Sequence, residues 1–338
     1  MDAVDPIDVV ILWVDVGDPA WQAARAAATG VSGETRYTGA NNEWDTLRYL
    51  LRSIEQYCPW ARRVHLVTPG QAPHWLVEDH PRLSVVDQRV ILPADASPSF
   101  NSMAVEVNLD RIPDLAPTFV YFNDDMLVLR ETTARDIVPR GRPAGFAVQN
   151  ALTASNDWSH WVLNAVGAVN AVFDKRRVMR SRPAKWFSPR YGRYLIRNIA
   201  LLPWGSFTGF FEPHVPMVLR TETFEEVRRR LPELIDMTTR SRVRSLSDVS
   251  PFLYRYWQLC TGDFSPVSPD AYGRFFEVNA ASLDAVEAHL RSSASMFVCL
   301  NDGPAADADG VREGLHALLD ARFPHPSTFE REPATQPG

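Results

Sequence analysis

The sequence predicts an α/β protein whose mostly parallel sheet is flanked by helices. Up to residue 125, short apolar runs alternate with segments of helical spacing, an order typical of parallel strands joined by crossover helices. The apolar run 119–122 ends abruptly in Asn123, Asp124 and Asp125. Buried strands end in this way when they deliver polar groups to the ligand-binding edge of such a sheet. The composition, 45% hydrophobic and 22% charged, is that of a globular chain.

The individual elements follow from the spacing of apolar residues. Four strands are expected in the first part of the chain, at 7–14, 63–68, 83–87 and 118–123. Helices are expected there at 44–57 and at 102–110, where Asn101 or Ser102 provides the N-cap. Beyond about residue 130 the pattern becomes irregular. The later elements are helices at 222–231 and 248–259, a strand at 296–302 and a helix near 305–321.

A chain of 338 residues is long enough for one enlarged domain or two closely associated ones. We expect an α/β core at 1–130 and an irregular basic insertion at 131–210. A C-terminal segment at 211–330 should complete the same domain, and 331–338 should be a frayed tail.

Charge and cysteine content narrow the class of protein. A net charge of −6 argues against a nucleic-acid binder, which normally carries a basic surplus. The three cysteines, Cys58, Cys260 and Cys299, lie in apolar settings without metal-ligand spacing. They are expected to be buried thiols in a reducing compartment. The acidic N-terminus is unlike a signal peptide, and the longest apolar run, 9–14, is far too short to cross a bilayer. A cytoplasmic protein without a transmembrane segment is expected.

Residues 175–197 form a basic block with nine lysines and arginines and no acidic residue. Within a net-acidic chain, such a block could face an anionic acceptor, a nucleotide or an anionic membrane surface. The alternative is a solvated basic face that pairs with acidic residues elsewhere in the chain.

Several acidic residues are candidates for a functional site. Adjacent carboxylates such as Asp124 and Asp125 repel each other unless a cation or a shared proton lies between them. The pair therefore suggests a divalent-metal site for a phosphorylated substrate, although Asn-Asp-Asp is also an ordinary turn sequence. Glu106 lies four residues after Ser102, so a helix would place both on one face. That helix could bring Glu106 into the same cleft as Asp125; alternatively, Glu106 only caps or solvates it.

Two segments in the second half of the chain carry further candidates. His214 lies between Pro213 and Val215-Pro216, in a segment expected to be stiff and extended. A histidine held in this way could accept a proton or donate to phosphate. Arginines alternate at 240, 242 and 244, and an extended chain would project all three from one side. Phosphate is the anion that such guanidinium groups bind best, and a solvent-exposed cluster is the alternative.

These residues occur in four ordered blocks, and together the blocks resemble the Stealth family of sugar-1-phosphate transferases. That family includes bacterial capsular polysaccharide phosphotransferases and the catalytic subunit of the lysosomal-enzyme N-acetylglucosamine-1-phosphotransferase. The first block is 7–19, with the run Ile7–Asp15, and the second spans 47–125. The third runs from His214 through Arg244 to 252–257, and the fourth is 298–302, Val-Cys-Leu-Asn-Asp.

The resemblance implies roles for particular residues. The family's catalytic set falls on Glu106, Asp125, His214 and Arg244. Three of these, His214, Glu106 and Asp125, compete for the role of general base. Mg²⁺ or Mn²⁺ is expected on Asp124, Asp125 and Asp302. Substrate-binding residues are expected at Trp13, Asp15, Arg48, Asn101, Ser102, Asn123 and Arg242.

The fold that the resemblance implies is a GT-A-like core that binds a nucleotide sugar, with a mainly helical C-terminal segment packed across the cleft. The implied reaction transfers an N-acetylhexosamine or hexose 1-phosphate from a UDP-sugar to a glycan or other hydroxyl acceptor, and UMP leaves. Two alternatives stay open. A metal-dependent glycosyltransferase would release UDP, and a catalytically silent protein would only bind the nucleotide or glycan. The oligomeric state is not indicated by the sequence.

Overall fold

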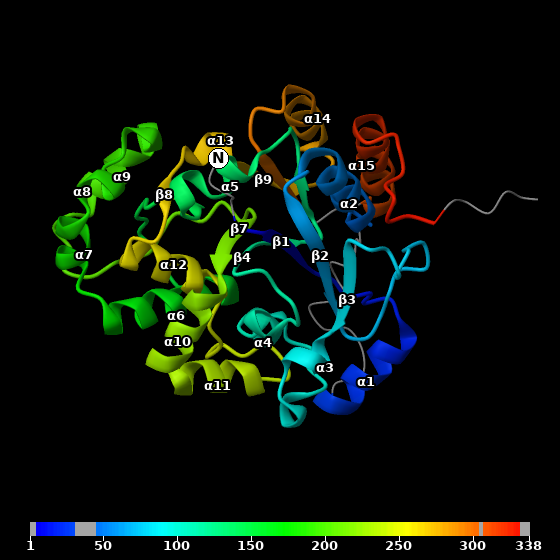
Figure 1. Ribbon diagram of the computed structural model, residues 1–338, viewed down its shortest axis with the longest axis horizontal. Helices are drawn as coiled ribbons and strands as arrows, with labels where there is room; N and C mark the ends of the chain where they lie inside the picture. Colours follow the sequence, from blue (N-terminus) through cyan, green and yellow to red (C-terminus); the bar gives the residue numbers. More distant parts are fainter. Residues whose placement is uncertain (1–4, 31–44, 304–306, 332–338) are drawn as a thin grey trace, which may run out of the picture.

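The computed structural model describes residues 5–30, 45–303 and 307–331. Its central sheet has five strands in the order β3-β2-β1-β4-β7, and the first four are parallel to one another. Strand β7 pairs antiparallel with β4 at one edge. The expected α/β fold, a mostly parallel sheet flanked by helices, is confirmed (Figure 1). The strands are β1 (Ile7–Leu12), β2 (Ala61–Thr68), β3 (Leu83–Asp87), β4 (Thr118–Asn123) and β7 (Met217–Arg220).

A second sheet continues directly from the first. Strand β5 (Met126–Val128) follows β4 after only Asp124 and Asp125. It pairs antiparallel with β10 (Phe297–Asp302), which pairs in parallel with β9 (Gly273–Val278). The turn at 123–125 therefore joins the two sheets, and the late strand expected at 296–302 ends beside it. A short ladder of β6 (Ala144–Gly145) and β8 (Ser265–Pro266) forms a third sheet.

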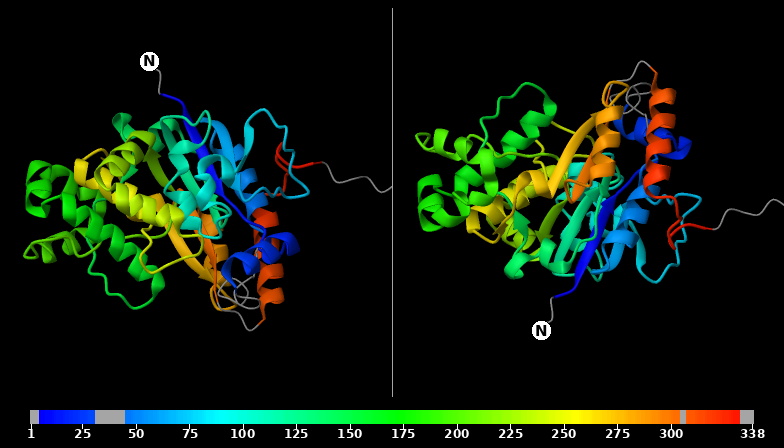
Figure 2. Two further views of the ribbon diagram at one scale, coloured as in Figure 1. Left: turned by 90° about the horizontal axis from the view of Figure 1, so that it is seen from below. Right: turned by 90° about the horizontal axis from the view of Figure 1, so that it is seen from above.

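Helices surround these sheets and extend the molecule to one side. Figures 1 and 2 place α7, α8 and α9 at one end of the long axis, with α1 and α15 toward the other. The helices of the first half are α1 (Pro19–Thr29), α2 (Leu47–Tyr57), α3 (Gln88–Ile91), α4 (Ser102–Glu106), α5 (Ala134–Ile137) and α6 (Asp157–Val172). Those that follow are α7 (Lys175–Ser181), α8 (Pro183–Trp186), α9 (Leu195–Ala200), α10 (Thr221–Arg230), α11 (Pro232–Arg240), α12 (Phe252–Thr261), α13 (Pro269–Tyr272), α14 (Leu283–Ser292) and α15 (Ala308–Arg322). Short 3-10 turns lie at 94–96, 109–111, 139–141 and 189–194.

The core is built on β1 and α12. Val9, Val10 and Ile11 of β1 are fully buried, which explains why this strand is continuously apolar after Asp8. Helix α12 is also buried nearly all round, and it packs against both α6 and α10. The Tyr254 ring of α12 stacks on Phe224 of α10 with 3.6 Å between the centroids. All three cysteines are free and buried, as expected.

Residues 131–210, expected to be irregular, are largely helical in the structure. The longest helix of the segment, α6, carries buried apolar residues at 162, 165, 166 and 169, a helical stripe that packs against α12. The sequence did not reveal it because the helix has almost no charged residues to mark a polar face. The helix expected at 248–259 begins instead at Phe252, after Pro251. Residue 44 and the tail 332–338 lie outside the described residues.

In the described part of the chain, we find no helix with the length and apolar character needed to span a bilayer. This agrees with the shortness of the apolar runs in the sequence.

Strand β1 begins at a buried carboxylate. Asp8 is fully buried, and the Arg62 guanidinium donates to it through two bonds, of 2.9 and 2.6 Å. His65 Nε2 lies 3.0 Å from Asp8 Oδ2, and the backbone N–H of Ala116 donates to the same oxygen. Burial alone would raise the pKa of Asp8, but these bonds hold it well below its ordinary value.

We therefore expect Asp8→Ala to lower the free energy of unfolding at pH 7 by about 3 kcal/mol. This value is at the low end of the range for removing one partner of a buried ion pair, because Arg62 is half-exposed. The depressed pKa of Asp8 stabilises the fold above the unfolded carboxyl pKa of about 3.9, so the difference from wild type should narrow as the pH falls below that value. Urea unfolding at pH 7 and pH 3 measures both effects. A loss under about 1 kcal/mol at pH 7 would contradict this account.

Candidate active site

A cavity of about 1000 Å³ lies where the two sheets meet. Its walls include the end of β1, the turn at 123–125 and the end of β10, so it lies at the carboxyl edge of the parallel strands. Open α/β sheets bind ligands at this edge. Most of the predicted site residues line it: Trp13, Asn101, Ser102, Glu106, Asn123, Asp124, Asp125, His214, Arg244 and Asp302.

Three predicted substrate-binding residues do not line the cavity. Asp15 closes a turn after β1, where its Oδ1 accepts from the N–H of Gly17. Arg48 lies over the ring of Trp75, 5.0 Å from its centroid. Arg242 donates to backbone carbonyl oxygens of the 94–97 segment.

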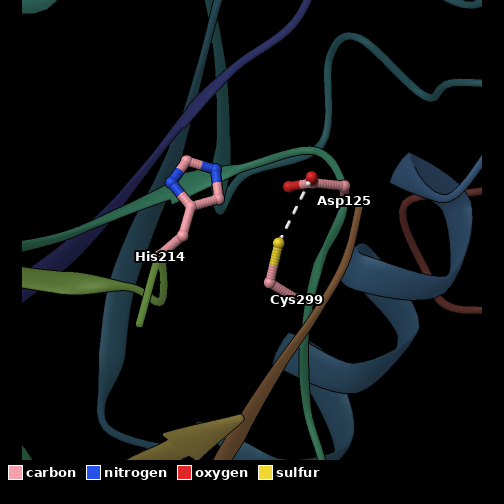
Figure 3. Close-up of side chains that lie close together, drawn as sticks. All are labelled: Asp125, His214 and Cys299. Atoms are coloured by element: carbon pink, nitrogen blue, oxygen red, sulfur yellow. Dashed lines mark hydrogen bonds between the residues drawn. The ribbon is translucent and has the colours of Figure 1, made fainter. Parts of the chain in front are cut away.

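Asp125, His214 and Cys299 come together from three separate segments (Figure 3). One ligand atom of each lies within 4.8 Å of the others. The Cys299 thiol donates to Asp125 Oδ2 at 3.3 Å. Burial, with the nearby Asp125 carboxylate, raises the pKa of that thiol well above its ordinary value. Cys299 therefore remains a neutral donor beside an acidic residue.

The other oxygen of Asp125 also bears on cation binding. Asp125 Oδ1 is buried and makes no hydrogen bond to any described residue. Burial, reinforced by repulsion from Asp125, raises the pKa of Asp302 to about 6. An orphaned carboxylate oxygen near a second acidic residue is an arrangement that a bound cation stabilises.

A chain of polar contacts links Glu106 to His214. The Tyr121 hydroxyl lies 2.7 Å from Glu106 Oε1 and 2.8 Å from Asn123 Oδ1. Asn123 Nδ2 in turn lies 3.2 Å from His214 Nε2. Tyr121 and Asn123 share one face of β4, because they are two residues apart in a strand. This strand therefore places two polar groups between the acidic residue and the histidine.

The tyrosine has one hydroxyl proton for two acceptors, which constrains the protonation of its neighbours. If Tyr121 donates to Asn123, both contacts are satisfied only when a protonated Glu106 donates to the tyrosine oxygen. Burial raises the pKa of Glu106, against the opposing effects of Tyr121 and Arg244, and so favours that state. Asn123 then donates to His214 Nε2, and the neutral ring carries its proton on Nδ1.

The backbone at His214 differs from the extended conformation expected there. Its φ is 48°, in the left-handed region that β-carbon-bearing residues rarely adopt. The ring meets Phe252 and Phe275 edge-on at 6.4 and 5.9 Å. The preceding Glu212 is held by a 3.0 Å bond from Arg255, although burial raises its pKa to about 7. The packed rings and this ion pair therefore hold the strained turn in place.

Arg244 enters the cavity on a loop that two other elements hold. Asn101 is the N-cap of α4, as expected, and its Nδ2 also donates to Ser241 O and Asp248 Oδ2. On the other side, Asn164 of α6 donates to the carbonyl oxygens of residues 246 and 248. Arg244 itself is exposed and donates to Ser102 Oγ at 3.0 Å. The loop 241–248 thus presents a guanidinium group to the cavity from a fixed position.

The three alternating arginines do not project from one extended strand, contrary to the expectation. Arg240 ends helix α11, where it forms ion pairs with Asp95 and with Asp236 one helical turn earlier. Its charge is therefore already neutralised outside the cavity. Only Arg244 of the three lines the cavity.

Aromatic side chains of α6 form one wall of the cavity. Trp158 and Trp161 both line it, and the Trp161 ring lies 5.4 Å from the Arg244 guanidinium carbon. Trp161 Nε1 also donates to Ser245 O at 2.8 Å. Trp158 is 40% exposed and meets Phe252 edge-on. An exposed indole at a cavity wall can stack on a sugar ring.

Sequence reasoning missed Tyr121, Cys299 and the α6 tryptophans as parts of this cavity. The alternation within β4 could have signalled Tyr121, since it precedes Asn123 by two residues. Cys299 faces Asp125 only because β10 pairs with β5, a long-range contact that no local pattern reveals.

Family models match most of the chain. Four models of the Stealth protein match in order: conserved region 1 at residues 5–31, region 2 at 40–143, region 3 at 213–259 and region 4 at 288–337. Residues 144–212, which include α6 to α9, fall between the second and third of these matches.

Individual relatives match over nearly the full length. The chain is 34% identical over 328 residues to an exopolysaccharide phosphotransferase, cps2G, of Lactiplantibacillus plantarum, with 96% of each chain covered. It is 29% identical over 341 residues to the capsular polysaccharide phosphotransferase WcwK of Streptococcus pneumoniae, covering 98% of this chain and 100% of that protein. The receptor polysaccharide phosphotransferase WefC of Streptococcus oralis is also 29% identical, over 97% of this chain and 100% of its own.

The tether between Asn101 and the loop 241–248 can be tested alone. Asn101→Ser keeps a side chain that caps α4 but removes both Nδ2 bonds. We expect it to lower the free energy of unfolding by about 1–3 kcal/mol, because the buried Asp248 loses a donor. Amide exchange should quicken at Ser245, whose N–H donates to Asp248 Oδ2. Unchanged exchange in this loop would show that Asn101 acts only as a cap.

Proposed function

This chain belongs to the Stealth family, and on that premise we propose that it is a sugar-1-phosphate transferase of polysaccharide synthesis or modification. The donor is a UDP-sugar that carries a hexose or N-acetylhexosamine, and UMP is the leaving group. The observation that carries the proposal is one cavity that Arg244 lines together with the acidic residues Asp125 and Asp302. The arginine side chain binds phosphoryl oxygens well, and the acidic residues would bind a cation that neutralises charge on the diphosphate.

The donor set of the cavity fits a hard divalent cation. Asp124, Asp125 and Asp302 contribute carboxylates to the cavity lining, and Asp125 Oδ1 is buried without a hydrogen bond to a described residue. Oxygen donors of this kind suit Mg²⁺ or Mn²⁺. When bound, the ion would neutralise the diphosphate and stabilise the leaving UMP. Cys299 supports this assignment by occupying Asp125 Oδ2 as a neutral thiol, which leaves Oδ1 as the ligand atom.

The reaction consists of one displacement at phosphorus. The acceptor hydroxyl oxygen forms a bond to the β-phosphorus, and the bond from that phosphorus to the bridging oxygen breaks, so UMP leaves with the bridging oxygen. Arg244 binds the transferring phosphoryl oxygens, and His214 donates to them through Nδ1, since its Nε2 lies against Asn123 Nδ2. The hydroxyl proton is lost late and passes to solvent water, because a loose transition state makes little demand on a protein base. Positioning and charge neutralisation then supply most of the rate enhancement.

A panel of UDP-sugars tests the proposal against its rivals. With a competent acceptor, UMP should accumulate in step with glycosyl-phosphate product. Accumulation of UDP would identify a glycosyltransferase, in which the bond breaks at the anomeric carbon instead. Tight UDP-sugar binding without turnover on any acceptor would identify a silent binding protein.

We further propose that the acceptor lies against the α6 wall. Helix α6 supplies Trp158 and Trp161 to the cavity and belongs to the segment 144–212, which no family model matches. The acceptor is the substrate that we expect to differ among family members. Its binding surface should therefore lie outside the regions that the family models match. A glycan stacking on Trp158 is consistent with the exposure of that indole ring.

Removing the metal should abolish activity. We expect enzyme dialysed against EDTA to be inactive until Mg²⁺ or Mn²⁺ is restored. Asp125→Asn should lose about 10²–10³-fold or more in kcat and bind Mn²⁺ weakly in a titration without substrate. Asp263→Asn is the matched control, because Asp263 pairs with Arg220 outside the cavity. Full activity in EDTA would exclude the metal.

Arg244 and Arg242 form a natural pair of test and control. Both are exposed on one loop, but only Arg244 lines the cavity. Arg244→Ala should lower kcat by about 10²-fold or more with an unchanged thermal midpoint, and Arg244→Lys should rescue little because an ammonium group cannot form a bidentate contact. Arg242→Ala should keep activity within a few-fold. Equal losses in both alanine variants would assign the effect to the loop as a whole.

Trp158→Ala tests the acceptor wall. We expect it to raise the KM for a soluble glycan acceptor by about tenfold, as the loss of one stacking contact implies, while the affinity for UDP-sugar stays unchanged. A raised KM for the UDP-sugar with an unchanged KM for the acceptor would show that the α6 wall contacts the donor instead.

A further inference from the structure

The end of the molecule formed by α7 to α9 exposes an unusual run of apolar side chains. Ile196, Ile199, Leu202 and Trp204 are 70%, 58%, 45% and 53% exposed. The first two lie three residues apart, on one face of α9, and the others follow in the turn beyond it. Large exposed apolar side chains are few in the described residues, and these four fall between positions 196 and 204. Such a concentration marks an interaction surface.

The opposite face of α9 explains why these side chains remain outside. Asn198 is fully buried and donates to the carbonyl oxygens of Ala147 and Trp186. Lys175, buried at the start of α7, donates to Leu201 O at 2.6 Å. Helix α9 is thus bound firmly through its inner face, and its apolar outer face has no described segment to cover it.

Arginines without acidic partners belong to the same end of the molecule. The chain has no Asp or Glu between residues 175 and 211. Arg193 forms a 3.2 Å ion pair with Asp270. The structure describes no ion pair for five other exposed arginines of the block, at 176, 177, 180, 182 and 190. The alternative of a basic face neutralised by acidic residues elsewhere therefore holds for Arg193 and not for these five.

We propose that residues 175–204, here called the end lobe, bind the surface of an anionic phospholipid membrane. Aliphatic side chains and a tryptophan suit the boundary between head groups and acyl chains, and arginines suit lipid phosphates. Figures 1 and 2 show α7, α8 and α9 projecting together at one end of the long axis, where a flat surface can reach them. The inference does not depend on the proposed reaction.

A second copy of the chain fits this surface less well. A two-fold interface would place the same arginines against themselves, and the lobe offers no acidic residue to separate them. Repulsion between like charges opposes such a dimer, whereas an anionic lipid surface complements the same charges.

Vesicle co-sedimentation of the full chain tests the proposal. We expect binding to vesicles of phosphatidylcholine with about one-third phosphatidylglycerol, little binding to pure phosphatidylcholine, and weaker binding at high salt. The double variant Ile196→Ser/Trp204→Ser and the double variant Arg176→Glu/Arg177→Glu should each reduce binding about tenfold or more. Val90→Ser is the matched control, because Val90 is 59% exposed outside the lobe.

Two further measurements distinguish a loss of membrane binding from a loss of folding or of catalytic activity. All the substituted side chains are exposed, so thermal midpoints should not change. Turnover of a soluble acceptor should also stay at the wild-type level, whereas Trp158→Ala should bind vesicles normally. Equal binding to neutral and anionic vesicles, no binding to either, or binding unaffected by the lobe variants would overturn the proposal. A dimer that dissociates when Trp204 is replaced would assign the surface to a second copy.

Discussion

The cavity depends on one short turn, in which β4 passes into β5 through Asp124 and Asp125. Because only two residues separate the strands, the chain cannot move these carboxylates away from the junction of the two sheets. Strand β10 then brings Asp302 to the same place, and the Cys299 thiol fixes the orientation of Asp125. Three acidic side chains are thus held at one junction of the fold. We propose that a cation relieves the repulsion between them and thereby allows an anionic, phosphorylated substrate to bind beside the carboxylates.

The remaining groups reach the junction on segments that are held from several sides. Asn123 and Tyr121 of β4 connect Glu106 to His214, and the strained backbone at His214 is supported by packed aromatic rings. The loop that carries Arg244 is tied to α4 by Asn101 and to α6 by Asn164. Positions fixed before a substrate arrives are what phosphoryl transfer requires, since charge stabilisation and alignment supply most of its catalysis.

Local patterns were sufficient to predict the parallel strands and the end of β4. The runs at 63–68, 83–87 and 118–123 are strands, and Asn101 caps the helix that carries Glu106, because these features depend on neighbouring residues. The differences between the sequence-based expectations and the structure have another origin. Helix α6 has only one charged residue to mark its outer face. Arg48 and Arg242 are not part of the cavity lining, and they contact partners that lie far along the chain. Long-range pairing, which a single sequence does not display, decided those cases.

We propose different substrates for the two sides of the cavity, with phosphoryl groups at the junction and an acceptor at the α6 wall. In the proposed reaction, the bond that breaks joins the β-phosphorus to the bridging oxygen of the diphosphate and does not lie at the sugar. A UDP-sugar labelled with ³²P at the β-phosphorus shows which bond breaks. We expect the label to pass to the acceptor together with the sugar and the released nucleotide to be unlabelled. Label retained in the nucleotide, with an unlabelled glycan product, would contradict it.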